Sequence, residues 1–145
     1  MKNTIGRLTT YTAAAILLGF GLVYLLRNSF MPYHSEAISL EWDKVEPATQ
    51  YLFLALMRAT SGGFIATAGA IIFLQYKLQE NKLSWIPLLI LILGTISMLC
   101  TLYAILTVCI HTPGRPPFAT DLIGEALLIV GFVFNRRYLL KQKSG

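Results

Sequence analysis

Four long apolar segments constrain this chain more than any other feature of its sequence. They cover approximately residues 9–26, 51–74, 85–110 and 119–134. A bilayer core about 30 Å thick is crossed by roughly 20 apolar residues in a helix, and lipid offers no partner for backbone groups left outside a helix or closed barrel. The segments lack the alternating polarity of transmembrane strands. We therefore expect an all-α membrane protein, a four-transmembrane-helix bundle forming a single integral membrane domain over residues 1–145.

Composition and charge exclude several other classes of protein. Charged residues make up 13% of the chain and hydrophobic residues 55%, whereas a soluble domain carries about 25% charged residues. This balance excludes an ordinary soluble enzyme and a disordered tail. The net charge is +5, but the basic residues flank the apolar segments instead of forming one basic face. We expect membrane lipids as the surroundings and no nucleic acid as a partner.

The distribution of Lys and Arg predicts the orientation. Eight of them belong to the N-terminus, the second connection and the C-terminus, and three to the first and third connections. The positive-inside rule then places both termini in the cytoplasm. Lys2 and Arg7 precede the first segment, as in a signal peptide, but its apolar part is long and no small-x-small cleavage pair follows. We expect a retained helix and a multi-pass protein.

The first connection, about residues 27–50, is the only long one. Within it Ile38, Trp42 and Val45 recur at helical spacing, with charged residues between them. This pattern predicts a short amphipathic helix on the extracytoplasmic membrane surface, with Trp42 at the level of the lipid headgroups. The third connection, residues 111–117, is rich in Pro and Gly and ends the helix before it.

Small residues predict where the helices pack, because membrane helices associate through close contact and hydrogen bonds. The second segment carries the most marked stripe of them, so we expect it at the centre of the bundle with this stripe facing inward. Close approach of a ligand to the backbone is the alternative reading. The stripes are Ala15 and Gly19 in the first segment; Ala55, Ala59, Gly63, Ala66 and Ala70, broadened by Gly62 and Gly69, in the second; and Gly94, Ser97, Thr101 and Ala104 in the third.

Arg58 and Glu125 are ionisable residues that interrupt the apolar segments. Insertion scales assign about 2.5–3.5 kcal/mol to such a residue at a helix centre, so each needs a partner or water. Counting along the two helices places both in the outer half of the bilayer. We hypothesise an Arg58–Glu125 ion pair between the second and fourth helices. It either fixes helix register or forms the polar floor of an outward pocket for an anionic headgroup, a quinone or a proton.

His34 and His111 are the two histidines, and both fall on the outer side. No metal-ligand spacing connects them, so solvated or interfacial histidines are the simpler interpretation. Together with Arg58, Glu125, Gly62 and Gly63 they form the set of candidate ligand-binding residues. The chain shows no phosphate-binding loop, dinucleotide fingerprint or nucleophile elbow. We therefore assign no catalytic residue, no metal and no cofactor, beyond a quinone or lipid in the pocket.

Two motifs resemble a known family. The segments Met57-Arg-Ala-Thr-Ser-Gly-Gly-Phe64 and Gly124-Glu-Ala-Leu127 are similar to features of the DoxX-like superfamily of small bacterial membrane proteins, including its uncharacterised relatives. The resemblance implies a four-helix bundle in the bacterial inner membrane, with a partner membrane subunit or a second copy of the chain. Some members are subunits of complexes for quinone-dependent sulfur oxidation. That activity is not carried over, because this sequence shows no set of redox-cofactor ligands.

The sequence thus favours a non-enzymatic or accessory inner-membrane protein. It would bind a lipid-like or quinone-like molecule, or a partner helix, near Arg58 and Glu125. The alternative is a small proton-coupled transporter in which Glu125 titrates. A small membrane-bound transferase is a third reading, and it needs polar residues converging at one depth. Besides the charged pair, the available ones are Thr60, Ser61, Ser97 and Thr101.

Overall fold

A computed structural model describes residues 3–143 as an array of helices, with no β-strand in that range. The elements are α1 (Thr4–Leu26), α2 (Pro32–Ile38), the 3-10 helix η1 (Trp42–Lys44), α3 (Pro47–Asn81), α4 (Ile86–His111) and α5 (Phe118–Lys143). Four of them, α1, α3, α4 and α5, are long and apolar enough to cross a membrane. The predicted all-α, four-helix membrane architecture is confirmed.

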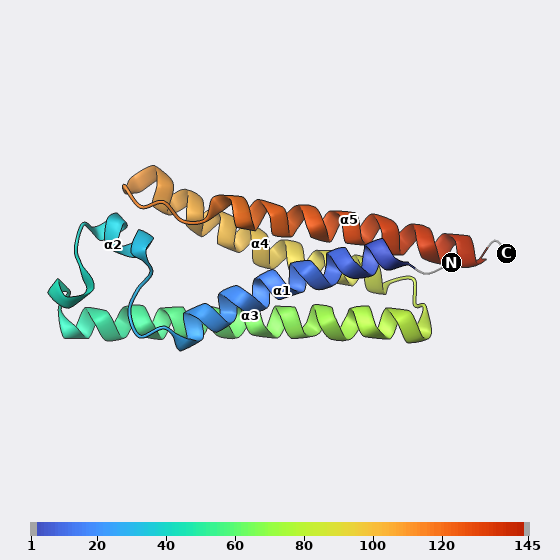
Figure 1. The fold of residues 1–145 in the computed structure, drawn as a ribbon, viewed down its shortest axis with the longest axis horizontal. Coiled ribbons are helices and arrows are strands. Elements are labelled where there is room, and N and C mark those ends of the chain that lie inside the picture. Colours follow the sequence, from blue (N-terminus) through green and yellow to red (C-terminus); the bar gives the residue numbers. More distant parts are fainter. Residues whose placement is uncertain (1–2, 144–145) are drawn as a thin grey trace.

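The four long helices form a ring. α1 packs against α3 and α5, and α4 packs against α5 and α3, the α1–α3 contact being the most extensive. Figure 1 shows both chain ends at one end of the bundle, called here the termini end, and α2 at the opposite end, called the cap end. Towards the cap end α3 diverges from α4 and α5.

The helices extend beyond the predicted apolar segments. α3 has 35 residues and is about 52 Å long, against a bilayer core of about 30 Å. The predicted segments stop just before Gln75 and Asn135, but α3 and α5 continue and bury these side chains at 0% and 1% exposure. Asn135 Nδ2 donates a hydrogen bond to Gln75 Oε1 over 2.9 Å, which offsets the cost of burying two amides.

The predicted packing stripes of α1 and α3 are wrong. Gly62 and Gly63 on α3 and Gly19 on α1 are exposed, with open space around them. The buried face of α3 carries mostly larger residues: Met57, Ser61, Phe64, Ala68, Ile71, Gln75 and Leu78. α1 supplies the small residues instead: Gly6, Thr10, Ala13, Ala14 and Gly21, besides Leu17. In lipid both faces of a helix are apolar, so hydropathy does not distinguish the inward face from the outward one.

Two glycines allow close helix contacts. A Cβ at Gly21 of α1 would lie 2.7 Å from Ile65 Cγ1 and 3.3 Å from the Ile65 backbone nitrogen. A Cβ at Gly94 of α4 would lie 2.4 Å from Leu128 Cδ1, as expected for a small residue at a helix seam. The absence of a side chain at these positions lets α1 approach α3 and α4 approach α5.

The first connection folds back over the bundle. Its α-helix covers Pro32–Ile38 and ends where Ser39 adopts a left-handed conformation with φ 55°. The predicted position around Trp42 is wrong, because that region forms only the single 3-10 turn η1. Trp42 packs edge-to-face on Phe30 with ring centroids 4.8 Å apart. Phe30, Val45 and Met57 form a small hydrophobic cluster, which attaches this connection to α3.

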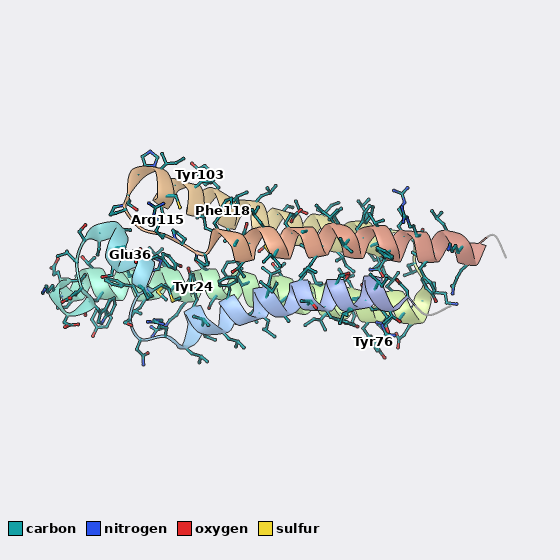
Figure 2. The ribbon with its side chains drawn as sticks, turned by 45° about the horizontal axis from the view of Figure 1, so that its top comes forward. Tyr24, Glu36, Tyr76, Tyr103, Arg115 and Phe118 are labelled. Atoms are coloured by element: carbon teal, nitrogen blue, oxygen red, sulfur yellow. The ribbon has the colours of Figure 1, made fainter. Side chains whose placement is uncertain are left out.

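The third connection binds to α2. A Cβ at Gly114 would lie 2.6 Å from the Tyr33 carbonyl oxygen, so only glycine permits this approach. The Arg115 backbone N–H donates to Glu36 Oε2 over 3.1 Å, and Figure 2 shows the two residues close together. We call residues 30–45 together with residues 113–116 the cap.

Replacing Gly21 by Leu tests the α1–α3 contact, with Gly19→Leu on the same helix as the matched control. We expect Gly21→Leu to lower the free energy of unfolding by about 1–3 kcal/mol through overpacking, whereas Gly19→Leu meets open space and leaves it unchanged or higher. Thermal unfolding followed by circular dichroism in mild detergent measures the difference. Equal stability of the two variants would contradict this packing.

Candidate functional site

A pocket of about 700 Å³ lies between α3 and α4, at the cap end of the bundle. Residues from α1, the cap, α3 and α4 line it. They are Tyr24, Tyr33, His34, Phe53, Leu56, Met57, Thr60, Gly63, Phe64, Thr67, Leu93, Ile96, Ser97, Cys100, Thr101, Ala104, Ile105, Val108 and Pro116.

The pocket opens on the side of the bundle. Leu56 and Ile96, at its rim, are 57% and 58% exposed, whereas Met57, Phe64 and Ile105 are buried behind them. In a bundle that spans a membrane, a side opening between two helices faces acyl chains. The walls are predominantly aliphatic and aromatic, so an apolar chain can enter from the bilayer without losing favourable surroundings.

Two tyrosines form part of the polar wall at the cap end. The hydroxyl groups of Tyr24, on α1, and Tyr33, on α2, are hydrogen-bonded to each other. Burial and this hydrogen bond raise the pKa of Tyr33 above its ordinary value, so Tyr33 stays protonated at neutral pH. Each hydroxyl carries one proton, and the pair uses only one between them. One O–H therefore remains to donate to a ligand.

His34 is the second polar group of this wall. Its Nδ1 accepts a hydrogen bond from the Met31 backbone N–H over 3.3 Å, which places the proton of the neutral ring on Nε2. Burial lowers the pKa of His34, so the ring is neutral at pH 7. Aromatic rings surround it, with centroids 4.4 Å away at Tyr33 and 6.0 Å away at Phe53. The Nε2–H group has no acceptor among the described residues and can donate to a ligand.

Two of the hydroxyls further along the pocket are bound to their own helices. Thr60 Oγ1 donates to the Leu56 carbonyl oxygen and Thr101 Oγ1 to that of Ser97, each over 2.9 Å. Their protons are thus used within the helices. Thr67 and Ser97 also line this part of the pocket, and their hydroxyls have no hydrogen-bond partner among the described residues. The donors of Tyr24, Tyr33 and His34 gather at the cap, and beyond it two hydroxyls interrupt walls that are mostly apolar, so the pocket is amphipathic.

The expected Arg58–Glu125 ion pair is wrong. Arg58 is exposed, and the ion pairs formed within residues 3–143 are Lys44–Glu41 and Lys77–Glu80. The physical reason is helix rotation: successive residues turn by about 100°, and Met57 occupies the inward direction. Counting residues estimates the depth of a side chain along the helix axis but not the direction in which it points.

Glu125 has a different partner. Its Oε1 accepts a hydrogen bond from Thr95 Oγ1 of α4 over 2.8 Å, and its Oε2 is buried with no partner among the described residues. Asp121, one turn earlier on α5, is 4% exposed. Its four-residue spacing to Glu125 puts both carboxyl groups on one helix face, a pairing that sequence reasoning did not consider.

The other sequence candidates divide between the pocket and the surface. His34 and Gly63 line the pocket, whereas Gly62 and His111 do not. His111 is exposed, and its Nδ1 lies 2.9 Å from the Thr107 carbonyl oxygen. Tyr24 and Tyr33 are not among the candidate residues from the sequence. A tyrosine on each side of a short connection is the available signal, but it does not indicate that the two hydroxyls meet.

In comparisons with known proteins, no family model, curated sequence or solved structure matches this chain.

The lowered pKa of His34 predicts a pH dependence of stability. Below the ordinary histidine pKa of about 6.5 the unfolded chain binds a proton that the folded chain resists. The free energy of unfolding should therefore fall as the pH decreases through and below 6.5. Chemical unfolding in detergent between pH 8 and pH 5 measures it. His34→Phe should flatten this slope, whereas His111→Phe should retain it, and an equal slope in both variants would contradict the buried, neutral His34.

Proposed function

We propose that this chain is a small inner-membrane protein, non-enzymatic or accessory, that binds a lipid-like or quinone-like molecule in the pocket between α3 and α4. The observation that carries the proposal is the amphipathic character of the pocket. Its side opening lies between two apolar helices, and its cap end carries the Tyr24–Tyr33 pair and His34. An apolar tail would lie along the walls, and a polar head would meet the hydrogen-bond donors at the cap.

The charge of the lining residues favours a neutral head. None of the residues that line the pocket is Lys or Arg, so an anionic headgroup would lack a counter-charge in a medium of low dielectric constant. His34 Nε2–H and one tyrosine hydroxyl are donors suited to carbonyl, hydroxyl or ether oxygens. A quinone ring with an isoprenoid tail has this chemistry, and the volume of about 700 Å³ lies within the usual range of roughly 300–1,000 Å³ for ligand pockets.

We further propose the bacterial inner membrane as the location, with both termini in the cytoplasm and the cap outside. The excess of Lys and Arg at the termini and in the second connection supports this orientation. Membership of the DoxX-like superfamily is part of the same proposal. It is supported by the two sequence motifs and by the number of candidate spans.

Neighbouring glycines of α3 provide a matched test. Gly63 lines the pocket and Gly62 does not, and a Cβ at either position meets open space. We expect native mass spectrometry of the wild-type protein in mild detergent to show a co-purified neutral amphiphile. Gly63→Leu should reduce its occupancy at least about tenfold by filling the pocket, whereas Gly62→Leu should retain it.

His34→Phe and His111→Phe extend the test to the polar end of the pocket. The first removes a donor from the lining and should weaken binding, while the second should have no effect. Absence of a bound amphiphile, after supplementation with ubiquinone or menaquinone during purification, would argue against the proposal. Equal occupancy in the two glycine variants would place the ligand elsewhere.

Proton-coupled transport is a second candidate, favoured by the surroundings of Glu125. Its carboxyl group has no cationic partner among the described residues, and one of its oxygens is buried without a hydrogen bond. Carboxyl groups inside membrane helices are typical of proton relays in pumps and transporters. Proteoliposomes with an internal pH-sensitive dye would show proton flux that Glu125→Gln abolishes and Glu80→Gln, at an exposed carboxylate, retains. Flux insensitive to Glu125→Gln would exclude this role.

A further inference from the structure

A chain of side-chain amides connects α1, α5 and α3 at the termini end. It begins at the N-cap of α1, where Asn3 Oδ1 accepts a hydrogen bond from the Gly6 backbone N–H over 3.2 Å. A backbone N–H can only donate, so this contact orients the Asn3 amide. The Asn3 Nδ2 group therefore points to Asn135, whose Oδ1 accepts from it over 2.5 Å.

The direction of the first hydrogen bond determines the direction of the later hydrogen bonds in this series of amides. With Oδ1 of Asn135 facing Asn3, its Nδ2 donates to Gln75 Oε1 over 2.9 Å and to Thr10 Oγ1 over 3.3 Å. Turning any one of these amides over would oppose two NH₂ groups or two carbonyl oxygens. The chain thus ends with a donor, Gln75 Nε2.

This last donor has no acceptor within residues 3–143. Gln75 is 0% exposed, and its Nε2 is buried without a hydrogen-bond partner. An unsatisfied buried N–H is unfavourable, so an acceptor from a bound molecule would stabilise it. Gln75 lines a cavity of about 270 Å³ together with Asn3, Arg7, Leu78, Gln79, Asn135 and Tyr138. The cavity lies at the opposite end of the bundle from the pocket described above.

The cavity lining is suited to an anion. Arg7 brings a guanidinium group, forms neither of the two ion pairs found among the described residues, and no Asp or Glu lines the cavity. Gln79 Nε2 already donates to Tyr11 Oη and to the Gln75 carbonyl oxygen. A water molecule occupies about 30 Å³, so the space holds a tetrahedral oxyanion.

We propose that this cavity binds a phosphate-class oxyanion, with Gln75 Nε2 as the buried donor and Arg7 as the counter-charge. The phosphate belongs either to a lipid headgroup or to a free ion. A neighbouring groove of about 620 Å³ shares Asn3 and Tyr138 with the cavity and is lined also by Ile5, Phe134, Arg137 and Lys141. This groove gives the acyl chain of a phospholipid a place beside the phosphate.

Two titrations of the delipidated full-length protein distinguish these sources. Inorganic phosphate is compared with chloride at equal ionic strength, and phosphatidic acid with a diacylglycerol of the same acyl chains. Thermal unfolding and native mass spectrometry report binding. We expect the phosphate-containing member of at least one pair to raise Tm and its partner to leave Tm unchanged.

Arg7→Gln should weaken phosphate binding about tenfold, because it removes a charge-assisted hydrogen bond. Arg136→Gln is the matched control, since it changes charge equally on α5, and Arg136 is not among the cavity-lining residues. Gln75→Met should also weaken binding. If Gln75→Met does not fold, Arg7→Gln alone tests the site, because Arg7 is exposed and its replacement leaves the packing of the bundle intact.

Each outcome is decisive. Arg7-dependent binding of inorganic phosphate supports a free oxyanion, and binding of phosphatidic acid alone supports a lipid headgroup. Binding of neither, or equal affinities of Arg7→Gln and Arg136→Gln, overturns the inference. Gly63→Leu, which fills the pocket at the cap end, should leave phosphate binding unchanged, so this result is independent of the proposed amphiphile.

Discussion

The close packing of α1 against its two neighbours is the contact on which the rest of the bundle depends. Lipid tails are as apolar as leucine, so helices in a membrane gain little from burying apolar surface and associate through tight contact and hydrogen bonds. α1 meets this requirement with Ala13 and Ala14, both 0% exposed, and with Gly21 against Ile65. Gly131 of α5 makes the corresponding approach to Thr10.

α1 is also the shortest of the four long helices, ending at Leu26. Beyond it α3 and α4 lie apart, and the cap closes the space that remains (Figure 1).

The two ends of the bundle solve the burial of polar groups in different ways. At the termini end, amides from three helices satisfy one another in a directed chain that leaves one donor, beside a guanidinium group. At the cap end, two tyrosine hydroxyls bond to each other and a histidine accepts from the backbone. These groups still have neutral donors left over at the wall of a mostly apolar pocket. Polar groups with a cation suit an anion, whereas neutral donors beside apolar walls suit an uncharged head with an apolar tail.

The candidate ligand-binding residues from the sequence and the residues that line the pocket overlap only in part. His34 and Gly63 line the pocket, whereas Arg58 faces outward and Glu125 bonds to Thr95. Depth along a helix follows from counting residues at 1.5 Å each. Rotation about the helix axis follows from packing, and an apolar helix in lipid has no polar face to indicate it. Gln75 and Asn135 were missed for a different reason. Their polarity ended the predicted apolar segments, although the helices continue through them.

The sequence by itself determined that the chain forms four apolar helices and where their irregular connections lie, because these properties depend on local composition and on backbone hydrogen bonds that lipid leaves unsatisfied. Only the tertiary structure decided which face of each helix is inside and which polar atoms meet. The Tyr24–Tyr33 contact and the Asn3–Asn135–Gln75 chain join residues from different helices. Their geometry depends on how the backbones approach, and no periodicity within one segment encodes that.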